Sequence, residues 1–152
     1  MSYIAREARQ ELLETVARAA EDIGAALALV EAAYELLDEG SADRLEEQLF
    51  RPVQGAYGRA RRTHTGFAER HGLDARALSP RQPTHAAAQP RELVEDAADA
   101  AVEAEDQLSE LQDSMMPVEV GDPELRAGLA EVRELLGDVS TRAREFVRTL
   151  GR

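Results

Sequence analysis

Carboxylates recur along residues 92–113 at alternating steps of four and three residues. This acidic stripe consists of Glu92, Asp96, Asp99, Glu103, Asp106, Glu110 and Asp113. On a helix the spacing keeps all seven on one face, where like charges repel weakly. Carboxylates suit hard divalent cations, but a straight row does not converge on one ion. We interpret the stripe as a solvated outer face. Pairing with arginines of another helix or of a partner protein, and a cation site, are the alternatives.

A second group of residues combines arginine with aromatic side chains. Residues 50–91 hold eight Arg and two acids, and Phe50, Tyr57, His64 and His71 recur every seven residues. We define a candidate arginine surface as Arg51, Tyr57, Arg59, Arg61, Arg62, His64 and Arg70. In the simplest interpretation these arginines bridge to acidic neighbours while the aromatic row flanks the core. The sharper one is a protein contact surface, because Arg and Tyr are favoured at interfaces.

The residue types needed for catalysis or cofactor binding do not come together. The chain has no Cys and no Lys, which excludes thiolate ligands and a lysine-containing phosphate loop. None of the three His stands in the Glu-x-x-His pairing of di-iron bundles. His64 beside Arg62 could accept a phosphoryl group, but surface histidines on helices are far commoner. We therefore expect no enzymatic activity, no cofactor and no metal.

Apolar residues in four segments follow the three–four rhythm of helices that pack along one stripe. The predicted helices span residues 2–39, 42–71, 91–116 and 122–150. The first stripe consists of Leu13, Val16, Ala20, Ile23, Leu27, Val30, Tyr34 and Leu37, with Leu12, Ala19, Ala26 and Ala33 beside it. Gly40 is predicted to end the first helix, with Ser41 capping the second. Asp122-Pro123 is predicted to start the fourth helix.

Two proline-rich features interrupt this pattern. Pro52 predicts a kink or break in the second helix, because proline removes a helical hydrogen bond and collides with the preceding turn. Residues 72–90 lose the periodicity and read as a linker. The sequence thus predicts one all-α domain over residues 1–152. Its expected form is a four-helix up-and-down bundle, or two antiparallel helical hairpins packed together, with a homodimer as one expectation.

The charge of the chain limits the expected partners. Its net charge of −12 argues against nucleic acid and against an anionic membrane surface. The charged N-terminal residues and the absence of a long apolar run favour a soluble cytoplasmic protein. The leading hypothesis is a non-enzymatic protein–protein interaction module, a subunit or adaptor of a larger assembly that binds a protein partner or itself.

Two other functions remain open from the sequence. One is a bundle that binds a small ligand or a divalent metal, through the acidic stripe or through a pocket near Pro52. The weaker one is nucleic-acid contact through the arginine surface, since such grooves also combine Arg with aromatic residues.

Overall fold

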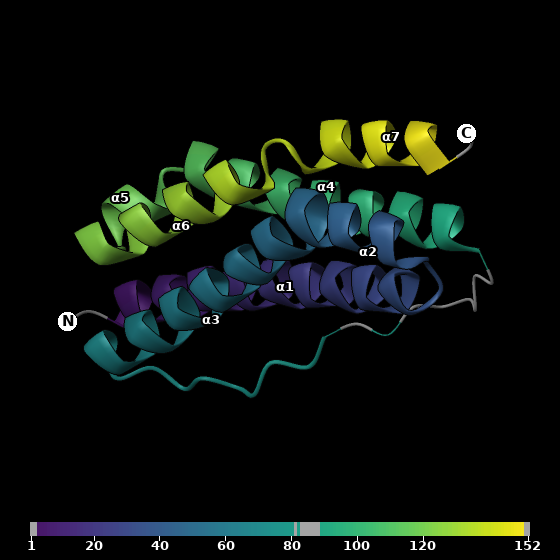
Figure 1. Cartoon of the computed structure of the whole chain (residues 1–152). Coiled ribbons are helices and arrows are strands. Elements are labelled where there is room, and N and C mark those ends of the chain that lie inside the picture. Colours follow the sequence, from purple (N-terminus) through teal and green to yellow (C-terminus); the bar gives the residue numbers. More distant parts are fainter. Residues whose placement is uncertain (1–2, 81, 83–88, 151–152) are drawn as a thin grey trace.

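The computed structural model describes residues 3–80, 82 and 89–150, and in this part of the chain it contains helices and no strand (Figure 1). The all-α class is therefore confirmed. The helices are α1 (Tyr3–Glu35), α2 (Glu39–Leu45), the π-helical turn η1 (Glu46–Phe50), α3 (Arg51–His71), α4 (Pro90–Asp113), α5 (Met116–Glu119), α6 (Pro123–Leu136) and α7 (Val139–Leu150). None of these described helices is long and apolar enough to cross a lipid bilayer.

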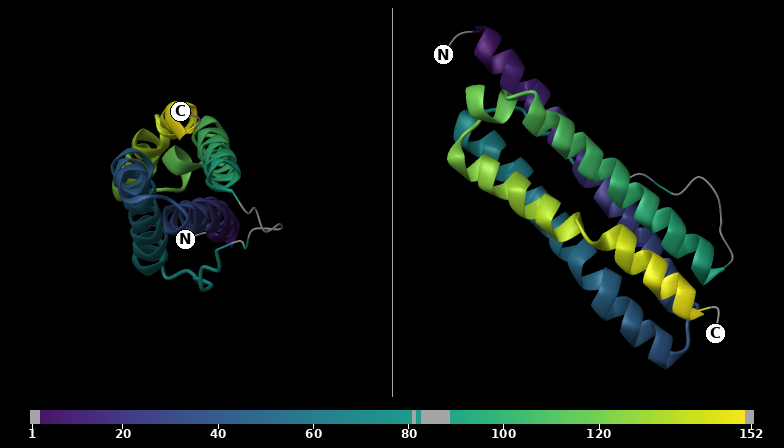
Figure 2. Two further views of the ribbon diagram at one scale, coloured as in Figure 1. Left: turned by 45° about the vertical axis from the view of Figure 1, so that its right-hand side comes forward. Right: turned by 90° about the horizontal axis from the view of Figure 1, so that it is seen from above.

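The helices form two antiparallel pairs, α1 with α2–α3 and α4 with α6–α7 (Figure 1). Residues 73–80 leave the end of α3 as an extended segment and run back beside α1. We call this segment the strap. α4 begins at the end of the bundle where α2 begins, so α3 and α4 run in the same direction (Figure 2). The alternating up-and-down order is thus not confirmed. The predicted linker residues 83–88 lie outside the described residues.

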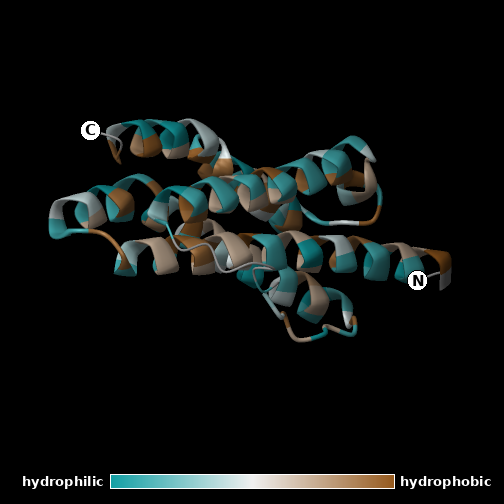
Figure 3. Ribbon diagram, turned by 90° about the vertical axis from the view of Figure 1, so that its right-hand side faces the viewer, coloured by the Kyte–Doolittle hydropathy of each residue, from teal (hydrophilic) through white to brown (hydrophobic). Residues whose placement is uncertain are grey.

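One hydrophobic core lies between these helices. α1 packs on α4 and α3, α6 packs on α3, and α7 packs on α4. Hydrophobic and hydrophilic bands alternate along each helix in Figure 3, as amphipathic helices require. Phe67, Phe146 and Ile23 are among the largest fully buried side chains.

The predicted stripe of α1 is buried over most of the helix. Leu13, Val16, Ala20, Ile23 and Val30 are almost completely buried, as are the flanking residues Leu12, Ala19, Ala26 and Ala33, whereas Tyr34, expected inside, is 39% exposed. A straight α-helix drifts from a strict seven-residue repeat. The core-facing line therefore leaves the predicted stripe toward the end of α1.

The helix that contains Pro52 continues through a π-helical turn in place of a break. The Arg51 N–H donates to the Glu46 carbonyl five residues earlier. Proline has no N–H and would collide with the carbonyl four residues before it in a regular helix. A wider turn with five-residue spacing lets the chain pass this point while remaining helical.

Two aspartates fix the starts of α2 and α6. The Asp38 carboxylate accepts from the Ser41 N–H, and the Asp122 carboxylate accepts from the Leu125 N–H. The predicted start at Asp122 is confirmed, but the cap of α2 is Asp38 and Gly40 lies inside its first turn, so both expectations for Gly40 and Ser41 are wrong. The left-handed glycine instead is Gly72, with φ 61°, at the end of α3.

The close approach of α3 and α6 predicts the effect of substituting a glycine. A Cβ atom at Gly128 would collide with the Thr63 hydroxyl. We expect Gly128→Ala to lower the free energy of unfolding by about 2 kcal/mol through overpacking. Gly55→Ala is the matched control, because its Cβ would meet only Leu135 at 3.7 Å. That variant should gain about 0.5 kcal/mol from helix propensity. Equal urea midpoints for the two variants would contradict this packing.

Candidate interaction surfaces

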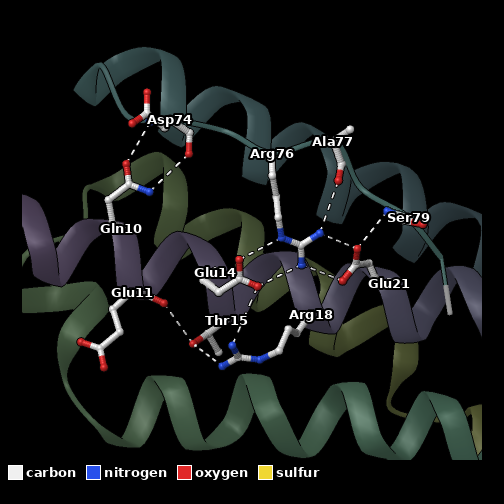
Figure 4. A network of polar contacts seen from close by, with 10 residues as sticks. All are labelled: Gln10, Glu11, Glu14, Thr15, Arg18, Glu21, Asp74, Arg76, Ala77 and Ser79. Carbon is white, nitrogen blue, oxygen red and sulfur yellow. Dashed lines mark hydrogen bonds and ion pairs between the residues drawn. The ribbon is translucent and has the colours of Figure 1, made fainter.

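Side chains of α1 hold the strap by hydrogen bonds to the backbone of the strap. Gln10 donates from Nε2 to the Asp74 carbonyl at 3.2 Å and accepts from the Asp74 N–H at 2.9 Å (Figure 4). The Glu21 carboxylate accepts from the Ser79 N–H at 2.8 Å. At the end of the strap, a Cβ atom at Gly24 would lie 2.9 Å from Pro80 Cβ. Polar side chains of one helix therefore satisfy an extended backbone that has no neighbouring strand.

Arg76 is the strongest polar anchor of the strap. Its Nε and Nη2 donate to both oxygens of Glu14 at 2.9 Å, and its Nη1 and Nη2 donate to Glu21 at 2.6 and 2.8 Å (Figure 4). Hydrogen bonds from Arg76 lower the pKa of both carboxyl groups and raise the pKa of the guanidinium. Paired donors and acceptors of this kind combine directional specificity with charge attraction.

His64 lies inside the protein rather than on the predicted arginine surface. Only 3% of it is exposed, and its Nε2 has no hydrogen-bond partner in the described structure. Burial lowers the pKa of His64, and the nearby Arg76 lowers it further, while Glu14 and Glu21 act in the opposite direction. A buried neutral imidazole is a poor candidate for phosphoryl transfer or partner contact, so His64 is withdrawn from that surface.

Two arginines of the predicted surface are paired within the chain. Arg59 donates from Nε to Glu131 at 2.6 Å. Arg70 donates to both oxygens of Asp122 at 2.8 Å and contacts Glu124 at 2.9 Å. Both pairs join α3 to residues at or within α6. Arg59 and Arg70 therefore stabilise a contact between helices instead of standing free for a partner.

Asp122 connects the start of α6 with the end of α3. Burial alone would raise the pKa of Asp122, but hydrogen bonds from Arg70, the Leu125 N–H and His71 outweigh it and hold the pKa below its usual range. The His71 Nε2 lies 2.9 Å from this carboxylate. One side chain thus caps α6 and pairs with two cationic or polar groups of α3.

The rest of the arginine surface remains exposed. Arg51, Arg61 and Arg62 are exposed, and none has an ion-pair partner in the described part of the chain. The Arg61 guanidinium lies 5.6 Å from the centroid of the half-buried Tyr57 ring, a cation–π contact. A shallow depression of about 430 Å³ adjoins them, lined by Gly58, Arg61, Arg62, Thr65, Gly66 and Glu69.

The acidic stripe follows the outer side of α4. All of its residues are exposed except Asp96, which is half-buried. Apart from Asp96, none of its carboxylates has an ion-pair partner among the residues that the structure describes. The leading interpretation of a solvated face agrees with this placement. The two α3 arginines that form ion pairs, Arg59 and Arg70, pair with acidic residues within and at the start of α6, and not with the acidic stripe.

Two grooves border the stripe. The one between α1 and α4 measures about 830 Å³ and includes Glu103 and Glu110 of the stripe. Gln107 Nε2 donates across it to the buried Asp22 at 2.6 Å. The groove between α4 and α7 measures about 580 Å³ and includes Asp99. No cluster of three or more His, Asp or Glu side chains in the described ranges is arranged to hold a metal ion.

Removal of the Arg76 side chain tests the anchoring of the strap. We expect Arg76→Gln to lower the free energy of unfolding by about 1 kcal/mol at low salt, since the exposed network is partly screened by solvent. The control Arg18→Gln removes one exposed pair with Glu14 at 3.8 Å and should cost about 0.3 kcal/mol. Urea unfolding measures both, and limited proteolysis should cut residues 73–80 faster in Arg76→Gln. Equal losses and equal cleavage would contradict the anchoring role.

The buried imidazole predicts how stability changes with pH. The pKa of His64 is lowered from 6.5 in the folded protein, so folding disfavours the protonated form. Its contribution is complete above about pH 6.5 and is lost as the pH falls toward the folded pKa. We expect the urea midpoint to fall between pH 7.5 and 5.5, and to fall less in His64→Leu. An equal fall in both proteins would show that His64 is not responsible.

The sequence matches no protein-family model, and neither curated proteins nor solved structures show significant similarity to it. The functional proposals therefore depend on the residues and contacts of this chain alone.

Proposed function

We propose that the chain is a non-enzymatic helical interaction module, acting as a subunit or adaptor of a larger assembly. The observation that carries this proposal is the division of the α3 arginines into two groups. Arg59 and Arg70 form ion pairs with acidic residues within and at the start of α6. Arg61 and Arg62, on the same helix, remain exposed beside Tyr57. Exposed arginines next to an aromatic ring are typical anchors of protein interfaces.

The exposed arginines and the acidic stripe carry opposite charges, which indicates the kind of partner each would bind. α3 and α4 lie on opposite sides of the bundle in the end-on view of Figure 2. The exposed arginines on one side and the acidic stripe on the other therefore cannot neutralise each other within one chain. Opposite charges placed this way favour association between copies, or with a third protein of complementary charge. Such contacts weaken as salt screens the charges.

The described residues give less support to the two alternative functions. The nucleic-acid alternative loses Arg59, His64 and Arg70 to internal contacts. The divalent-metal alternative through the stripe gains no converging set of ligands in the described part of the chain. The small-ligand alternative near Pro52 is favoured by a separate pocket beside the π-helical turn.

A charge reversal at the exposed arginines tests the interaction module. We expect the double variant Arg61→Glu/Arg62→Glu to lose self-association or partner binding while its helical content stays unchanged. The matched control is Arg144→Glu/Arg148→Glu, which changes the charge equally on exposed positions of α7. Light scattering from about 50 mM to 1 M salt measures the mass of each protein, and co-purification measures partner binding. Circular dichroism checks the fold. The proposal is wrong if both double variants behave alike in both assays.

A further inference from the structure

A separate pocket lies between the last turns of α1 and the π-helical turn. Its lining consists of Glu31, Tyr34, Glu35, Glu46 and Phe50. The volume of about 340 Å³ falls in the range of small-ligand sites. The lining includes none of the residues of the arginine surface, although Arg51 directly follows Phe50 in the sequence. The pocket also shares no residue with Arg61, Arg62 and Tyr57, on which the proposed interaction depends.

The charge of this pocket is one-sided. Three of its five lining residues are carboxylates and none is basic. Glu31, Glu35 and Glu46 have no ion-pair partner among the described residues. The last turn of α1 contains no basic residue, although the negative end of a helix dipole favours cations there. Glu31 and Glu35 are also like charges at a spacing of four. The pocket therefore concentrates repulsion that a bound cation would relieve.

Two aromatic rings complete the lining. Tyr34 is 39% exposed, and Phe50 is half-buried against the core. The face of an aromatic ring carries negative charge density and attracts an organic cation, most strongly where water is partly excluded.

The π-helical turn brings η1 to this position. Glu46 is its first residue and Phe50 its last, so the turn that Pro52 requires also supplies one wall of the pocket. π-helical turns are costly irregularities that occur frequently at functional sites.

We propose that this pocket binds a monovalent organic cation, a guanidinium or alkylammonium group, against Tyr34 and Phe50. Glu31, Glu35 and Glu46 balance its charge. A hydrated divalent ion gains nothing from aromatic walls, and an anion is repelled by the three carboxylates. The cationic group could belong to a free small molecule or to an arginine or lysine side chain of another protein. Both sources present the same chemistry to the pocket.

The direct test compares a cation with a neutral molecule of nearly the same shape. Butylguanidinium is titrated to about 10 mM while the ring signals of Tyr34 and Phe50 are followed by NMR, with Tyr57 and Phe67 as internal references. We expect saturable shifts at Tyr34 and Phe50 alone. Butylurea, which lacks the charge, should bind at least tenfold more weakly. Equal binding of butylurea, or no saturable shift with butylguanidinium, would overturn the proposal.

Variants separate the contributions of charge and ring. Glu31→Gln/Glu35→Gln/Glu46→Gln should weaken butylguanidinium at least tenfold, and Tyr34→Leu should weaken it about threefold. The control Glu103→Gln/Glu110→Gln/Asp113→Asn removes the same charge from the acidic stripe and should leave binding unchanged. Circular dichroism verifies that each variant is folded. Equal weakening in the two triple variants would reduce the effect to net charge and refute a site.

A second ligand identifies the source of the cation. A short glycine-flanked arginine peptide carries the same guanidinium on a polypeptide backbone. Binding at least as tight as that of butylguanidinium assigns the pocket to a protein side chain. Exclusion of the peptide, with retained binding of the small cation, assigns it to a free molecule. Both results support a cation pocket, whereas failure of both ligands to bind contradicts it.

Discussion

One guanidinium shared by two carboxylates holds the extended strap along α1. Arg76 bonds Glu14 and Glu21, which lie about two turns apart on the same helix, so the two contacts align the strap with the helix axis. α4 begins at the opposite end of the molecule from the end of α3 and packs antiparallel on α1. The buried contacts between α1 and α4 fix the relative direction of these helices, and the surface network secures the segment that crosses α1.

The remaining charges are divided between those that fix helices and those that face outward. Asp122 and Glu131 take up arginines of α3 and so align it with α6. Apart from Asp96, the carboxylates of the acidic stripe pair with no arginine among the described residues, and neither do Glu31 and Glu35 near the end of α1. Part of the net charge of −12 therefore lies along the outer side of α4 and part lines the pocket at the end of α1, where a positive group would be attracted.

The helices could be located from the sequence because their apolar residues repeat over several turns. The start at Asp122 could also be predicted, because its cap is local in sequence. The contacts that could not be predicted are those set by distant segments. Nothing near Arg76 indicates that its carboxylates lie more than fifty residues earlier. His64 follows the same seven-residue rhythm as Tyr57, yet the first is buried and the second stays half-exposed. Tyr34 lies outside the core because small changes in helix phase accumulate along α1.

The π-helical turn also affects the geometry of the continuous helix that α2, η1 and α3 form. Leu45, Leu49 and Val53 are buried at two consecutive steps of four, followed by a step of three to Ala56. Such a stutter in a heptad pattern unwinds the helix locally. Each residue added or removed within the turn would rotate α2 by about 100° relative to α3. The number of residues within this turn therefore sets the rotation of α2 relative to α3.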